Sequence, residues 1–147
     1  MDLNRYQGLW YEIASYPASF SIGCVGTTAT YTLQPDNRLG ILNECKVRRF
    51  QGFEREARAV GRVADSETNA KLALTFEGNS FEEPYWIIDL DAENYQYAVV
   101  SNPQRSGLFI LSRQPTLSSV AYEGILERLL AQDYDLSRLR ITSQQRR

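Results

Sequence analysis

The residue types that most often carry out catalysis are scarce in this sequence. Its 147 residues include no histidine, which removes the commonest general base and the commonest side-chain ligand of transition metals and haem. Cys24 and Cys45 are the candidate nucleophiles, and neither has an evident activating base. Glu12 lies in an apolar segment, where a carboxyl group needs a hydrogen-bond partner, a cation or a proton. We therefore expect a protein that is not an enzyme and has no metal site and no cofactor. An isomerase or redox enzyme that uses a thiol or Glu12 is the alternative.

The segment between the two cysteines has the pattern of a β-hairpin. Residues 27–33 are rich in β-branched and aromatic side chains, residues 35–37 form a Pro-Asp-Asn turn, and residues 39–46 run back. The short turn fixes which residues face each other across the two strands. The expected register pairs Leu33 with Leu39, Tyr31 with Ile41 and Ala29 with Asn43.

The same register places Cys45 opposite Thr27, three residues from Cys24. A disulfide between the two cysteines therefore requires a bulge or bend, which Gly23 or Gly26 would tolerate. We expect this disulfide, and two buried free thiols are the alternative. A disulfide would indicate an oxidising compartment.

Charge and hydropathy exclude two further classes of protein. Sixteen lysines and arginines against eighteen acidic residues give a net charge of −2, and the basic residues are mostly scattered. We therefore expect no nucleic-acid partner. No segment has the ~20 apolar residues that span a bilayer, and the first three residues do not form a signal peptide. The length fits one domain, expected at residues 4–143 with a disordered tail at 144–147. Whether a leader or lipid-anchor segment precedes Met1 stays open.

Most of the chain alternates between apolar and polar residues, as half-buried strands do. The expected strands cover residues 9–15, 27–33, 39–46, 55–63, 71–76, 84–90, 95–101 and 108–112. Eight short strands at regular spacing favour a β-sandwich or a β-barrel.

The pattern changes to a helical period after residue 115. Ser118 is suited to cap the helix, and its apolar residues are Val120, Ile125, Leu126, Leu129 and Leu130. A single helix after eight strands must bury its apolar stripe on the outside of the sheet. Residues 136–142 are expected to add one short final strand.

Three segments in this order resemble the lipocalins, and the likeness is closest to their bacterial, apolipoprotein-D-like branch. They are Gly8–Ala14, the hairpin segments Thr28–Tyr31 and Leu42–Asn43, and Leu108–Arg113 before the helix. The resemblance extends from about Leu3 to the end of the chain. It implies an all-β fold, an eight-stranded up-and-down antiparallel β-barrel with one C-terminal α-helix packed on its outside. It also implies a single hydrophobic pocket that is open at one end.

The resemblance assigns structural roles to two residues. It implies that Trp10 closes the barrel floor and that Arg113, from the end of the last barrel strand, lies across the indole ring. A guanidinium group over an indole contributes roughly 0.5–2 kcal/mol. The turn at residues 102–106 is expected at the same closed end of the barrel.

Alternation along the strands then assigns side chains to the barrel interior. If Trp10 points inward, Glu12 and Ala14 point inward with it. Small residues on the strand 55–63 leave room for an open pocket, and a barrel filled by its own side chains is the alternative. The candidate ligand-binding residues are Glu12, Tyr31, Asn43, Ala59, Leu74, Phe76, Tyr97 and Phe109, with Ala98 as the alternative to Tyr97.

We interpret the chain as a protein for binding, transport or storage of a small hydrophobic or amphiphilic ligand. The resemblance implies a ligand of the fatty acid or lysophospholipid class, and a periplasmic, outer-membrane-associated or secreted location. An interaction module is a further alternative, since Phe20 and Ile22 in the loop 17–23 could form a peripheral membrane contact, a dimer contact or a lid. We expect a monomer or a weak homodimer.

Overall fold

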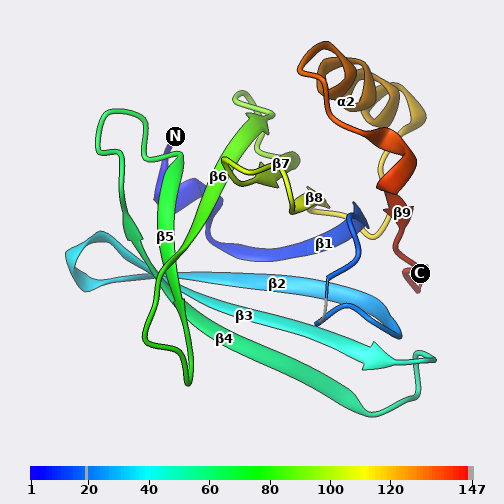
Figure 1. Ribbon diagram of the computed structural model, residues 1–147, viewed down its shortest axis with the longest axis horizontal. Coiled ribbons are helices and arrows are strands. Elements are labelled where there is room, and N and C mark those ends of the chain that lie inside the picture. The colour runs from blue at the N-terminus through cyan, green and yellow to red at the C-terminus, as the bar shows by residue number, and fades with distance from the viewer. Residues whose placement is uncertain (19, 146–147) are drawn as a thin grey trace.

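Eight antiparallel strands close into a barrel in the computed structural model of the protein, which describes residues 1–18 and 20–145 (Figure 1). The barrel strands are β1 (Gly8–Ser15), β2 (Cys24–Gln34), β3 (Arg38–Val47), β4 (Glu54–Val63), β5 (Lys71–Phe76), β6 (Glu83–Leu90), β7 (Tyr97–Ser101) and β8 (Leu108–Ser112). The other elements are α1 (Leu3–Tyr6), α2 (Ser119–Ala131), β9 (Arg140–Ile141) and two 3-10 turns, η1 (Pro35–Asn37) and η2 (Leu136–Arg138). Each barrel strand pairs with the next, and β1 pairs with both β8 and β2. The predicted up-and-down barrel with one main helix after it is confirmed.

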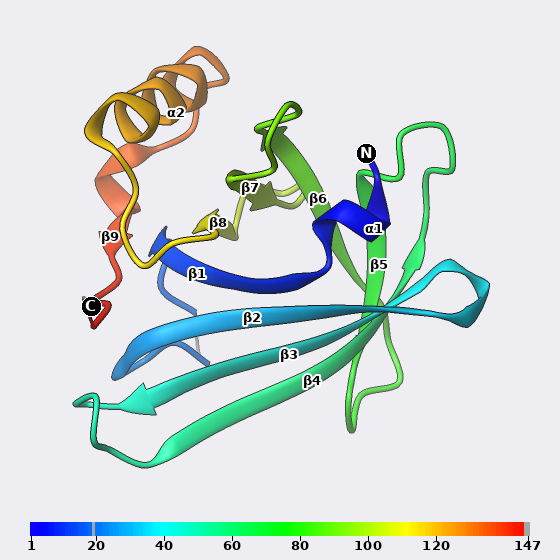
Figure 2. The ribbon, with the colours of Figure 1, turned by 180° about the vertical axis from the view of Figure 1, so that it is seen from behind.

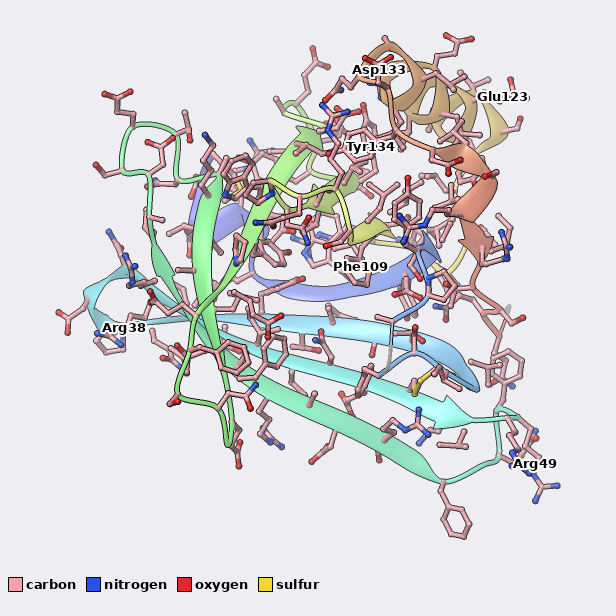
Figure 3. The ribbon with its side chains drawn as sticks, in the orientation of Figure 1. Arg38, Arg49, Phe109, Glu123, Asp133 and Tyr134 are labelled. Carbon is pink, nitrogen blue, oxygen red and sulfur yellow. A yellow bond between two sulfur atoms is a disulfide. The ribbon has the colours of Figure 1, made fainter. Side chains whose placement is uncertain are left out.

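The two ends of the barrel differ in what covers them. Because neighbouring strands are antiparallel, the β1–β2, β3–β4, β5–β6 and β7–β8 connections share one end, and α1 packs at the other. Figure 3 shows Arg38 and Arg49 at the opposite ends of β3. Residues of the β1–β2, β5–β6 and β7–β8 connections line the mouth of a cavity. The β7–β8 turn, which includes residues 102–106, therefore lies at the open end, and its expected place at the closed end is wrong.

The β2–β3 hairpin has the predicted register over most of its length. Leu33 pairs with Leu39, and Ala29 pairs with Asn43. The register then shifts between Val25 and Thr28, where Gly26 has a φ of 64° that favours glycine. This bulge brings the two cysteines together, and the predicted disulfide between Cys24 and Cys45 is confirmed, with a Cα–Cα distance of 5.5 Å.

Buried side chains form two clusters on the two faces of the barrel wall. The inner cluster includes Trp10, Tyr31, Ile41, Leu74 and Leu111. The outer cluster lies between the wall and α2, and it includes Val99, Ile110, Ile125, Leu129 and Tyr134.

A bulge in β1 changes the face to which its last residues belong. Glu12 pairs with Leu111, but the register of β1 against β8 shifts before Ala14, which pairs with Ile110. Ala14 therefore packs in the outer cluster under α2. The expectation that Ala14 points into the barrel is wrong, because strict alternation does not continue through a bulge.

Helix α2 contacts the barrel through a narrower stripe than its sequence predicts. Ser118 Oγ caps the helix by accepting from Ala121 N at 3.2 Å, as expected. Ile125 and Leu129, one helical turn apart, are buried. Val120 and Leu130, which we expected in the same stripe, are 81% and 57% exposed. In the described part of the chain, no helix has the length and apolar character needed to cross a membrane.

The segment after α2 returns to the barrel wall at its open end (Figure 2). β1 pairs with β2 only through its first four residues, and β9 with residues 142–144 lies alongside the rest of β1. Thr142 N donates to Ile13 O at 2.9 Å, and Gly26 N donates to Ser143 O at 2.7 Å. Gln144, which we placed in the tail, makes two hydrogen bonds to β1 and β2. Residues 146–147 of that tail lie outside the described residues.

Candidate ligand-binding cavity

Trp10 and Arg113 form the floor of the closed end. The indole of Trp10 is fully buried, and its Nε1 donates to Tyr6 O at 2.7 Å. The Arg113 guanidinium carbon lies 3.9 Å from the centroid of the indole ring. Arg113 also donates to the carbonyl oxygens of Arg5 at 2.7 Å and Leu9 at 3.0 Å, so it joins α1 to the start of β1. Partial burial lowers the pKa of the Arg113 guanidinium.

Three tyrosine hydroxyl groups meet above this floor. Tyr85 donates to Tyr31 at 2.7 Å, and the hydroxyl oxygens of Tyr6 and Tyr85 are 2.6 Å apart. Burial raises the pKa of Tyr31 to about 12 and raises those of Tyr6 and Tyr85 well above their usual value. All three therefore stay neutral hydrogen-bonding groups at physiological pH.

A cavity of about 800 Å³ lies within the barrel above the tyrosines and opens between the loops. This volume is in the range of small-molecule sites, about 300–1,000 Å³. Six of the eight predicted ligand-binding residues line it: Glu12, Tyr31, Asn43, Leu74, Phe76 and Phe109. Figure 3 shows Phe109 where β8 faces β1. The structure thus brings together predicted residues from five strands, β1, β2, β3, β5 and β8, on one largely apolar wall.

The other two predicted residues do not line this cavity. Ala59 belongs to the inner cluster and pairs with Ile41 and Phe76, which both line the cavity, but Ala59 itself does not line it. Tyr97 lies on the outer face of β7, and its hydroxyl accepts from Arg128 Nη2 of α2 at 3.3 Å. Ala98 takes the inward position, because it pairs with the inward residue Leu111 on β8. The choice of Tyr97 over Ala98 was therefore wrong.

Glu12 lies in the cavity wall and is only 5% exposed. Burial raises the pKa of its carboxyl group, and hydrogen bonds from the Thr142 and Ser15 hydroxyls act in the opposite direction. Thr142 Oγ1 donates to Glu12 Oε2 at 2.5 Å. The sequence suggested a tyrosine or arginine partner, whereas the structure supplies a threonine from the C-terminal segment.

Sequence reasoning missed several residues of the site. Thr27, Tyr85 and Val100 line the cavity, and Tyr6 completes the tyrosine group. The position of Thr27 was available from the sequence, because it is two residues from Ala29 on the same face of β2. Tyr6 carried no such signal, since it precedes the first strand and belongs to the short helix α1.

Comparison with known proteins gives a consistent assignment. The family model described as a lipocalin-like domain matches residues 1–144. The chain is 36% identical to temperature-induced lipocalin-1 of Arabidopsis thaliana, with 98% of this chain and 80% of that protein covered. It is 33% identical to the outer membrane lipoprotein Blc of Vibrio cholerae, over 98% of this chain and 83% of that protein.

Solved structures with the same fold include lobster apocrustacyanin A1. That structure matches with a TM-score of 0.75 at 19% identity, and it covers 97% of this chain and 79% of the apocrustacyanin chain. At that identity the likeness concerns the fold alone. The family model and the two relatives, together with the closed barrel, show that the chain belongs to the lipocalin family.

Proposed function

We propose that this protein binds a small hydrophobic or amphiphilic ligand inside the barrel, for transport or storage. The observation that carries the proposal is the cavity of about 800 Å³, which is open at one end and is lined by apolar side chains together with polar ones. We infer a ligand of the fatty acid or lysophospholipid class, because a single acyl chain fits a narrow barrel with a polar mouth. Each buried methylene group contributes about 0.8 kcal/mol, so a chain of ordinary length supports micromolar binding.

The proposed function is non-catalytic. The only two cysteines form a disulfide, so neither is available as a thiol nucleophile. The thiol enzyme that the sequence left open therefore has no candidate residue. Glu12 has no basic group beside it in the described residues that would act with it on a substrate.

A fluorescent fatty acid tests the proposed function. Its emission should rise on titration with the protein, and unlabelled lysophospholipid should displace it. Ala57→Trp places a large side chain in the cavity wall and should lower the affinity at least about tenfold, because the ligand loses buried methylene contacts. Val60→Trp is the matched control, since Val60 lies on the outer face of the same strand β4 and is 39% exposed. Equal affinity of both variants would contradict binding inside the barrel.

Peripheral membrane contact is a second proposal, favoured by the loops at the open end. Ile22, Phe53 and Phe81 lie in or beside three of these loops and are 69%, 88% and 58% exposed. Large exposed apolar side chains around the mouth would let the ligand pass between the barrel and a bilayer. Phe53→Ser should weaken co-sedimentation with phospholipid vesicles. Val120→Ser on α2 removes an equally exposed apolar residue away from the mouth and should have no effect.

We also propose an oxidising location, periplasmic, outer-membrane-associated or secreted. The disulfide supports it, because such bonds persist mainly outside the reducing cytosol. Alkylation of the protein in intact cells should label neither cysteine before reduction and both after it. Two reactive thiols in the unreduced protein would contradict this location.

A further inference from the structure

One buried hydroxyl group on the cavity wall has no partner. Thr27 on β2 is 7% exposed, and its Oγ1 has no hydrogen-bond partner among residues 1–18 and 20–145. Buried polar groups almost always have a partner, because an unpaired one loses its hydrogen bonds to water without replacement. Thr27 lines the cavity. Oγ1 itself is covered by neighbouring atoms, so rotation of the Thr27 side chain about χ1 would present its hydroxyl to a ligand in the cavity.

Glu12 lies beside Thr27 on the neighbouring strand. Gln144 Nε2 donates to the carbonyl oxygens of both residues at 2.8 Å, so one side chain bridges the two backbones. Both side chains line the cavity. Glu12 Oε2 accepts from Thr142, and the described residues place no lysine or arginine within ion-pairing distance of Glu12. The Ser15 hydroxyl also hydrogen-bonds this carboxyl group. Because two carboxyl oxygens offer about four acceptor positions, the group retains acceptor capacity for a ligand hydroxyl.

We propose that Thr27 and Glu12 form a subsite for a neutral hydroxyl group on an amphiphilic ligand. The ligand hydroxyl donates to the Glu12 carboxyl group and accepts from the Thr27 hydroxyl, so both groups are satisfied. This inference rests on the proposed function, because it names the polar group that the same cavity selects.

Other oxygen groups fit the pair less well. An ether or ester oxygen only accepts, so it makes one of the two hydrogen bonds. An ionised carboxylate would bring a second negative charge to Glu12 without a nearby cation. Among amphiphiles with equal chains, the subsite therefore favours those that carry a free hydroxyl group.

The position of the pair also sets the direction of the ligand. β2 runs from the open end to the closed end, so Thr27 lies nearer the mouth than Ala29 and Tyr31. Below the subsite, the wall consists mainly of apolar residues such as Ala29, Ile41 and Leu74. The hydroxyl group thus lies near the mouth, and the chain extends toward the tyrosines.

Matched ligands test this subsite. Displacement of bound N-phenyl-1-naphthylamine at pH 7 measures the affinities of 1-decanol, its methyl ether 1-methoxydecane, and decanoate. The wild-type protein should bind decanol about tenfold more tightly than the ether, since a site that pairs a hydroxyl rejects analogues that lack it. Decanoate should also bind less tightly than decanol.

Variants on β2 separate the subsite from the rest of the cavity. Thr27→Val should bind decanol and the ether with similar affinity, without lowering the affinity for the ether or the thermal stability. Thr27→Ser keeps the hydroxyl and should keep the preference. Thr32→Val makes the same change at an exposed position of the same strand and should behave as wild type.

Two results would overturn the inference in distinguishable ways. Equal affinity of the wild-type protein for decanol and the ether would remove the subsite and leave the proposed function standing. Failure of the naphthylamine and of every decyl ligand to bind would overturn the proposed function together with the subsite.

Discussion

At the scale of single residues, alternation along β1 predicted the position of Glu12 but not its hydrogen-bond partner. Period-2 alternation from Trp10 placed Glu12 in the barrel wall, and the structure has it there. Its partner Thr142 is 130 positions away. No local sequence pattern predicts the contact with Thr142, because it depends on where the C-terminal segment returns to the barrel wall.

Replacing Glu12 with glutamine should change how stability depends on pH. Burial raises the Glu12 pKa in the folded protein above its unfolded value of about 4.3. The folded state therefore binds this proton more tightly than the unfolded state does. The contribution of the protonated Glu12 to the free energy of unfolding is full below the unfolded pKa and is lost as pH rises through the folded pKa. Glu12→Gln should therefore lose less free energy of unfolding between pH 4 and pH 8 than wild type.

Urea denaturation across that pH range measures the difference. Glu127→Gln on the exposed face of α2 is the control and should follow the wild-type curve. A Glu12→Gln curve parallel to wild type would contradict the buried state of this carboxyl group.

Trp10→Ala should be severely destabilising. It opens a cavity beneath the tyrosines and removes the surface on which Arg113 stacks at 3.9 Å, at an expected cost of about 3–5 kcal/mol. Arg113→Ala should cost less, in the same direction. Chemical denaturation measures both costs. A Trp10→Ala protein of normal stability with weaker ligand affinity would show that Trp10 belongs to the pocket rather than the floor.

At the scale of elements, the sequence predicted the strands better than their irregularities. Strands β5 and β8 have the predicted bounds, and the other barrel strands differ by one to three residues at an end. The final strand, expected at residues 136–142, is confined to β9 (Arg140–Ile141), because residues 136–138 form the turn η2. The bulge near Gly26 was expected, because a disulfide between Cys24 and Cys45 requires one in the expected register. The bulge after Glu12 was not, since no glycine or proline marks it, and this is why Ala14 was placed on the wrong face.

Reduction of the disulfide should destabilise the β2–β3 hairpin at the open end. The bond joins residues 21 positions apart, and a loop of this length contributes roughly 3 kcal/mol on the chain-entropy model. The melting temperature should therefore fall in the presence of a reductant. A Cys24→Ser, Cys45→Ser double variant should have the same melting temperature as the reduced protein. If the double variant and the reduced protein both had the melting temperature of the oxidised protein, the disulfide would make no such contribution.

At the scale of the whole molecule, the barrel follows from the number and spacing of the strands, but its interior does not. Six of eight predicted residues line the cavity, because alternation and hairpin register fix the inward face of each regular strand. Tyr97 and Ala59 failed for different reasons. Parity alone could not choose between Tyr97 and Ala98. Ala59 is buried in the inner cluster, but its position on the inward face did not bring it into contact with the cavity.

The central claim is that an acyl chain lies inside this barrel. Calorimetric titration with single-chain lysophospholipids of increasing chain length, each below its micellar concentration, tests it most directly. We expect one ligand per protein and an affinity that rises about fourfold per methylene, which corresponds to about 0.8 kcal/mol, until the cavity is filled. Affinity that is independent of chain length, or no saturable binding, would contradict the account.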